Sequence, residues 1–126
     1  MTNLIALPSG TELAGDYRID RVLGAGGFGV TYLAEEMALS RQVTIKEYFP
    51  SDFAARTKEA DACPRSQGCE GDYKWGLERF IEEAQTLAKF NHPHIMRVYR
   101  CSAPTTPLTW CCISRKAKAS RLGSRV

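Results

Sequence analysis

The chain has 126 residues, of which 44% are hydrophobic and 25% charged, as is ordinary for one soluble globular domain or part of one. No apolar run is long enough to cross a membrane and no signal peptide is recognisable, so a cytoplasmic protein is expected. The formal net charge of +3 comes from residues 100–126, which hold six Lys or Arg and no acidic residue. A basic tail can bind nucleic acid or an acidic membrane surface, but a non-native or disordered end explains it better, so no nucleic-acid partner is expected.

Three β-strands are expected in the first half of the chain, after a leader of residues 1–16 that is broken by proline and glycine. Residues 17–24 alternate between two faces, and residues 30–36 are rich in β-branched and aromatic side chains. Residues 41–49 form the third strand. The expected faces are Tyr17, Ile19, Arg21 and Leu23 against Arg18, Asp20 and Val22 in the first strand, and Val43 and Ile45 against Thr44 and Lys46 in the third.

A polar stretch from about residue 50 to 71 contains Pro64 and Gly68 and is expected to be a loop or irregular insertion. It holds Cys63 and Cys69, two of the five cysteines of the chain. Their C-x5-C spacing is not usual for zinc, and neither histidine is placed to complete a site. Reduced thiols are therefore favoured over a disulfide or a metal site.

One main helix is expected from Asp72 to Asn91, with Asp72 as its cap and Pro93 beyond its end. Residues 95–100 are expected to form a short fourth strand. Sequential strands with short connections pair antiparallel, and one helix can cover one face of their sheet, so the predicted fold class is α+β. The apolar stripe of the helix consists of Leu77, Phe80, Ile81, Ala84, Leu87 and Ala88.

Three glycines, Gly24, Gly26 and Gly29, have the spacing G-x-G-x-x-G. A dinucleotide-binding loop needs a helix directly after them, and the β-branched Val30 and Thr31 disfavour one. A Walker-type P-loop is excluded because no Gly-Lys-Ser/Thr follows the glycines. A glycine hairpin between two strands can instead lay free backbone amides over phosphates, or it can bind nothing.

Lys46 and Glu83 favour the phosphate-binding alternative. Lys46 stands in an apolar strand, where its ammonium group would act as a point charge on phosphate oxygens. Glu83 lies at the edge of the apolar stripe of the helix and could orient the lysine, although a solvated carboxylate is the alternative reading. Glu47 lies near the position of a ribose-binding acid in dinucleotide folds, but it is discounted because it belongs to a different strand.

The stretches LGAGGFGVTYLA, VTIKEYFP and ERFIEEAQTLAKFNHPHIMRVY resemble, in this order, the N-terminal lobe of bacterial-type serine/threonine protein kinases. The resemblance covers about residues 17–100 and implies ATP with Mg²⁺ as the ligand. It also implies that Lys46 contacts the α- and β-phosphates, that Glu83 is its ion-pair partner and that Leu23 borders the adenine. The ATP-binding residues it implies are Leu23, Gly24, Ala25, Gly26, Gly27, Phe28, Gly29, Val30, Thr31 and Lys46.

The chain departs from the family pattern in two kinds of position. Thr31 and Thr44 stand where the family usually has valine and alanine near the adenine, and their hydroxyl groups would weaken ATP binding. The catalytic-loop H-R-D and the metal-binding D-F-G are absent, since Asp52-Phe53 is followed by alanine and precedes the helix. The chain alone is therefore expected to be inactive, and a protein substrate is expected only for an intact parent kinase.

The resemblance stops near Cys101, and residues 102–126 are expected to be a disordered basic tail foreign to the family. We hypothesise a frameshift after Cys101. Read one base earlier, the codons of Trp110, Cys111 and Cys112 permit an apolar run such as Met-Val-Leu, typical of a kinase strand. Sequencing of the gene downstream tests this; the rival view is a natural short protein whose tail binds an acidic partner.

Two other functional classes remain open at this point. The chain could be a non-catalytic interaction module that keeps the shape of the kinase lobe. A Rossmann-type oxidoreductase would require a helix after Gly29.

Overall fold

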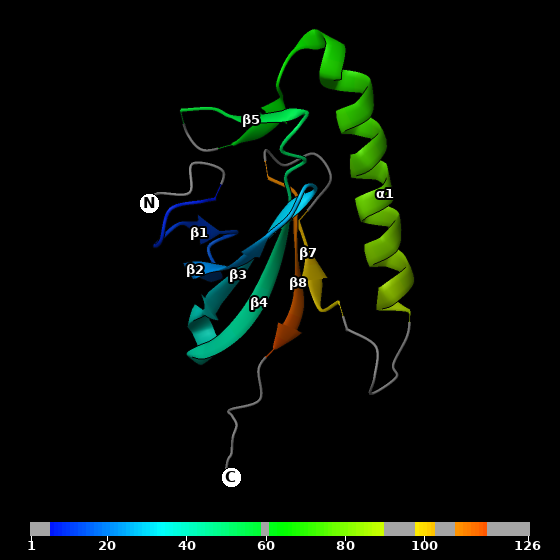
Figure 1. Cartoon of the computed structure of the whole chain (residues 1–126). Helices are drawn as coiled ribbons and strands as arrows, with labels where there is room; N and C mark the ends of the chain where they lie inside the picture. The colour runs from blue at the N-terminus through cyan, green and yellow to red at the C-terminus, as the bar shows by residue number, and fades with distance from the viewer. Residues whose placement is uncertain (1–5, 59–60, 90–97, 103–107, 116–126) are drawn as a thin grey trace.

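The computed structural model describes residues 6–58, 61–89, 98–102 and 108–115. Its main element is a six-stranded sheet in the order β1-β2-β3-β4-β8-β7, with α1 beside the β7 and β8 strands (Figure 1). A second sheet pairs β5 with β6. The elements are β1 (Glu12–Leu13), β2 (Tyr17–Ala25), β3 (Gly29–Glu36), η1 (Met37–Leu39), β4 (Arg41–Tyr48), β5 (Ala54–Arg56), β6 (Ala62–Pro64), η2 (Gln67–Cys69), α1 (Glu70–Ala88), β7 (Arg100–Cys101) and β8 (Trp110–Arg115).

All strand pairs of the main sheet are antiparallel, which confirms the predicted α+β fold. β2, β3 and β4 correspond to the three strands expected from alternation and β-branched content. Val43 and Ile45 are buried on one face of β4, whereas Thr44 and Lys46 are half-buried on the other, as predicted. No helix follows Gly29, because β3 begins at this residue, and the dinucleotide-binding alternative is therefore wrong.

The expected faces of β2 are wrong beyond Ile19. The register between β2 and β3 shifts between Ile19 and Arg21 and again between Val22 and Gly24. Each irregularity places an extra residue in one strand and reverses the alternation that follows it. Arg21 is consequently exposed, and Val22 packs against the core in place of Leu23.

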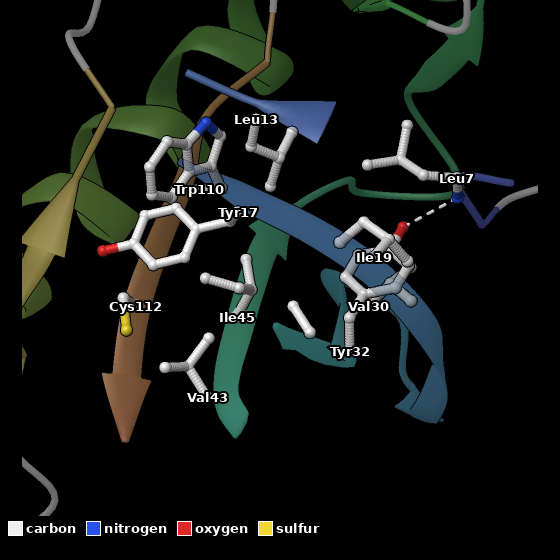
Figure 2. Packing of buried hydrophobic residues seen from close by; sticks show 11 residues of the cluster. Leu7, Leu13, Tyr17, Ile19, Val30, Tyr32, Val43, Ile45, Trp110 and Cys112 are labelled. Carbon is white, nitrogen blue, oxygen red and sulfur yellow. Dashed lines mark hydrogen bonds between the residues drawn. The ribbon is translucent and has the colours of Figure 1, made fainter. Parts of the chain in front are cut away.

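One face of the sheet carries the hydrophobic core (Figure 2). Leu7 and Leu13 belong to it, so the segment expected as a leader covers the core rather than preceding the domain. Tyr17 and Trp110 meet edge to face with ring centroids 5.4 Å apart. Burial of each large side chain contributes about 1.5–3 kcal/mol. The core consists of Leu7, Leu13, Tyr17, Ile19, Val30, Tyr32, Ala34, Val43, Ile45, Trp110 and Cys112.

β8 corrects the expectation that everything after Cys101 is disordered. The strand lies between β4 and β7 and is hydrogen-bonded to both. Trp110, Cys112 and Ile113 are buried. The edge of β4 would otherwise leave backbone N–H and C=O groups unpaired next to an apolar core. A short run of aromatic, small and β-branched residues forms a strand there, because it pairs with these groups and buries its side chains in the core. The remaining tail residues, 103–107 and 116–126, lie outside the described part.

The insertion is more regular than expected. Residues 54–56 and 62–64 pair as β5 and β6 and form the insertion hairpin. The helix begins two residues before the expected cap, since Cys69 is its N-cap residue and Asp72 lies in the first turn. Of the expected fourth strand, only Arg100 is in β7, and residues 95–97 lie outside the described part.

The apolar stripe of α1 is only half-buried. Leu77, Phe80, Ile81 and Leu87 are each partly covered, and α1 has no fully buried residue among those described. The helix therefore packs on the sheet less closely than the strands pack on each other. Within the described ranges, no helix is long and apolar enough to span a membrane.

The cysteines differ in state. Cys63 and Cys69 carry free thiols, in agreement with the favoured reading, and Cys112 is buried and forms no disulfide. Cys101 and Cys111 face each other across β7 and β8 and form a disulfide, which sequence reasoning did not anticipate.

Candidate functional site

The glycine turn, residues 26–29, joins β2 to β3. The N–H of Gly26 donates to the Gly29 carbonyl at 2.9 Å and closes the turn. Phe28 at its tip is 70% exposed. A Cβ atom at Gly24, Gly26 or Gly27 would meet nothing within 4 Å, so the outer surface of the turn is open to a ligand.

Two backbone amides of this turn are free to bind an anion. Within the described residues, no group accepts a hydrogen bond from the N–H of Gly27 or Phe28. The carbonyls are engaged, because Phe28 accepts from the N–H of Phe49 at 3.0 Å and Gly27 from that of Ser51 at 3.1 Å. Successive free N–H groups in a turn form a concave anion-binding surface.

The predicted lysine lies in one row with the glycines. Gly24 pairs with Thr31 across β2 and β3, Thr31 with Lys46 across β3 and β4, and Lys46 with Cys111 across β4 and β8. Neighbouring strands lie about 4.8 Å apart, so Lys46 is two strand spacings from Gly24. The sheet thus brings an ammonium group and the glycine turn to one region.

Lys46 and Glu83 are not brought together. Lys46 is half-buried on the face opposite the core, and Glu83 is exposed on α1. Among the ion pairs formed by the described residues, none includes Lys46 or Glu83. Their pairing stays a prediction.

Two other predicted ATP-binding residues lie in different surroundings. Leu23 is 47% exposed on β2, next to Gly24. The Val30 side chain is buried in the core, on the face of β3 opposite Thr31, because successive side chains of a strand alternate. Val30 can therefore contribute its backbone to a ligand on the Lys46 face, but not its side chain.

An apolar groove of about 290 Å³ runs between α1 and the strands β7 and β8. Phe80, Ile81 and Ala84 line it from the helix, and Cys111 of β8 and Thr109, just before β8, line it from the other side. Cys111 is the register partner of Lys46, so the groove adjoins the row that contains the lysine.

Glu47, next to Lys46, is a buried structural carboxylate that the sequence analysis did not recognise as such. Glu47 is fully buried, and its carboxylate forms an ion pair with Arg56 of β5. The available signal was its strand position, since alternation places Glu47 on the same face as Val43 and Ile45. A carboxylate on a core face needs a partner, and the insertion supplies it.

No metal-binding cluster is present in the described part of the chain, where no group of three or more His, Cys, Asp or Glu could hold an ion. The site itself offers two amides and an ammonium group. Such a donor set fits phosphate oxygens rather than a metal ion.

Three curated proteins illustrate what the chain is similar to. It is 33% identical over 90 residues to the serine/threonine-protein kinase PrkC of Bacillus subtilis, covering 71% of this chain and 11% of that protein. It is 33% identical over 91 residues to the serine/threonine-protein kinase pkn2 of Myxococcus xanthus, covering 72% of this chain and 9% of that protein. It is 34% identical over 94 residues to the serine/threonine-protein kinase PknJ of Mycobacterium tuberculosis, covering 75% of this chain and 13% of that protein. The chain thus spans about a tenth of the length of these relatives, and no protein-family model matches it.

Solved structures agree with this similarity. The apo form of PpkA-294 superposes with a TM-score of 0.80 at 32% identity, over 87% of this chain and 38% of that one. The kinase domain of a double mutant of Mycobacterium tuberculosis PknI superposes with a TM-score of 0.57 at 22% identity, over 88% of this chain and 36% of that one. The second match bears on the fold alone.

Proposed function

Because this chain is homologous to bacterial serine/threonine protein kinases and has the fold of their N-terminal lobe, we propose that it binds ATP through the glycine turn and Lys46. One observation carries the proposal. The free amides of Gly27 and Phe28 and the ammonium group of Lys46, which has no ion-pair partner among the described residues, belong to one end of the β2-β3-β4 sheet.

Each group has a defined role in this proposal. The two amides donate to phosphate oxygens, and Lys46 contacts the α- and β-phosphates as a point charge. Leu23, exposed beside Gly24, borders the adenine. Glu83 becomes the ion-pair partner of Lys46 when α1 moves toward β4. Mg²⁺ arrives with the nucleotide, since the described part of the site offers no carboxylate cluster to hold it.

We further propose that the chain by itself does not transfer phosphate. Phosphoryl transfer requires an acidic residue that orients the acceptor hydroxyl and further residues that hold Mg²⁺, and this sequence contains neither an H-R-D nor a D-F-G motif. In an intact parent kinase, the acceptor would be a protein serine or threonine. Incubation with Mg²⁺-ATP and a generic protein substrate should give no transfer, and transfer that depends on Lys46 would contradict the proposal.

Displacement of a fluorescent ATP analogue tests the binding. The wild-type chain should bind it, and Lys46→Met should weaken binding about 10- to 100-fold, as expected for loss of a charge-assisted contact. Lys74→Met is the matched control, because Lys74 is exposed on α1 and belongs to no part of the site. Equal affinities of the wild type and Lys46→Met contradict the proposal, and absence of binding by the wild type favours an interaction module.

A further inference from the structure

The insertion hairpin is joined to the lysine strand by a buried ion pair. Both Nη atoms of Arg56 donate to the Glu47 carboxylate, Nη1 to Oε2 at 2.5 Å and Nη2 to Oε1 at 2.7 Å. Glu47 has no exposed surface, and the Arg56 guanidinium also lies 4.3 Å from the centre of the Phe49 ring. This two-point geometry fixes the direction of β5 relative to β4.

Tyr32 extends the ion pair to β3 and to the N-terminal segment. Its hydroxyl donates to Glu47 Oε1 at 2.7 Å and accepts from the N–H of Leu7 at 2.9 Å. Burial and the Glu47 carboxylate raise the pKa of Tyr32, so the hydroxyl remains a donor at neutral pH. β3, β4 and β5 therefore meet at one carboxylate, next to Lys46 in sequence, and the N-terminal segment joins them through the Tyr32 hydroxyl.

The same part of the chain holds the tip of the glycine turn. The carbonyl oxygens of Gly27 and Phe28 accept from Ser51 and Phe49, which begin the insertion after β4. Ser51 is held in turn, because its carbonyl accepts from Arg65 Nη2 at 2.6 Å, just beyond β6. The Glu47 carbonyl lies 2.5 Å from the position of a Cβ at Gly29, so the turn closes directly onto β4.

These bonds direct a ligand-binding amide. In a planar trans peptide the C=O and the following N–H point in opposite directions. The bond from Ser51 to the Gly27 carbonyl therefore turns the N–H of Phe28 away from the insertion. An amide held in this direction needs no reorientation when an anion arrives.

A buried ion pair by itself is a poor source of stability, because the desolvation of both charges offsets their attraction. A pair of packed apolar side chains would serve the fold equally well. What the ion pair adds is a fixed geometry between β3, β4 and the insertion.

We propose that Arg56 is a positioning residue for the glycine turn: through Glu47, and with Arg65 acting on Ser51, the insertion sets the direction of the phosphate-binding amide of Phe28. This role deepens the proposed function and rests on it for its nucleotide readout. The state of the turn can also be measured without any nucleotide.

Two double variants separate positioning from stability. Glu47→Met with Arg56→Met removes the buried pair without leaving a charge unpaired. Arg79→Met with Glu82→Met removes an ion pair on the exposed surface of α1 and is the matched control. Urea unfolding of both shows whether the sheet remains intact.

The first readout is amide exchange without nucleotide. Gly26, Phe49 and Ser51 donate the bonds that hold the turn, so their amides should exchange about tenfold faster in the buried-pair variant, with α1 unchanged. Arg65→Met, which removes an exposed side chain, should accelerate hydrogen exchange of the Ser51 amide alone. This variant decides whether the insertion holds the turn if the double variant does not fold. Unchanged exchange in every folded variant overturns the proposal.

The second readout compares ATP with adenosine. A mispositioned turn should weaken the binding of ATP about tenfold and leave the binding of adenosine unchanged, because only the phosphates contact the turn. A merely structural role would change both affinities together, and this result also overturns the proposal. If the wild-type chain binds no ATP, the proposed function fails, while the exchange experiment still decides whether the insertion holds the turn.

Discussion

The hydroxyl of Tyr48 occupies the space that a side chain at Gly76 would need. Tyr48 ends β4, and its hydroxyl donates to the Tyr73 carbonyl in the first turns of α1 at 2.7 Å. Its ring also meets Phe80, with centroids 5.6 Å apart. Because α1 has no fully buried residue among those described, this close approach is a main attachment of the helix to the sheet.

Gly76→Ala should destabilise the protein although alanine is the better helix former. The added Cβ would lie far inside van der Waals distance of the Tyr48 hydroxyl and 3.3 Å from Cζ. We expect a net loss of about 1–3 kcal/mol in the free energy of unfolding, which exceeds the gain in helix propensity of about 1 kcal/mol.

Urea unfolding of the two single variants and the double variant measures this coupling. Tyr48→Phe removes the clashing hydroxyl, so Gly76→Ala should cost less in that background by about 0.5–3 kcal/mol. Additive effects of the two substitutions would contradict the packing explanation.

Two glycines of the motif should respond differently to alanine. At Gly29 a Cβ would lie 2.5 Å from the Glu47 carbonyl, whereas at Gly24 it would meet nothing within 4 Å. We expect Gly29→Ala to lower the free energy of unfolding by about 1–3 kcal/mol, and Gly24→Ala to change it by less than about 0.5 kcal/mol. Thermal unfolding of both variants tests the difference, and equal losses would contradict the register at the start of β3.

Arg56→Met alone should be far more damaging than the apolar double variant. The single substitution leaves the fully buried Glu47 carboxylate without its cation, at a cost of about 3–5 kcal/mol. Glu47→Met with Arg56→Met should restore most of this loss. Urea midpoints compare the two, and the finding that the single variant is the more stable would show that the carboxylate is solvated.

Alkaline pH should destabilise the protein partly through Tyr48. Burial raises the pKa of Tyr48 to about 12. A folded-state pKa above the unfolded value of about 10 gives stability that is present below about pH 10 and lost as the pH rises toward 12. Tyr48→Phe should therefore show a shallower decline over this range, by up to about 1.4 kcal/mol per pH unit.

Urea unfolding between about pH 9 and pH 12 measures the two declines. Tyr99→Phe, at a tyrosine that is 40% exposed, is the control for loss of a tyrosine hydroxyl at the surface. Parallel curves for the wild type and Tyr48→Phe would show that the Tyr48 hydroxyl ionises as readily in the folded chain as in the unfolded one.

The glycine turn, the lysine strand and the helix could be predicted from local patterns, because alternation, β-branched content and helical spacing are properties of short segments. The faces of β2 could not, since the irregularities after Ile19 arise only when β2 pairs with β3. The insertion hairpin was missed for a similar reason. Its strands have three residues each and are too short to show an alternating pattern. They are held in place by the contacts of Arg56 with Glu47 and of Arg65 with Ser51.

By itself, the sequence determined that a glycine turn joins two strands and that a lysine follows on the third, because turn chemistry and strand alternation are encoded locally. Only the tertiary structure decided which neighbours these residues have. It placed Trp110–Arg115 beside β4, buried Val30 away from Lys46 and joined Glu47 to Arg56. Each of these depends on the packing of distant segments, which no local pattern contains.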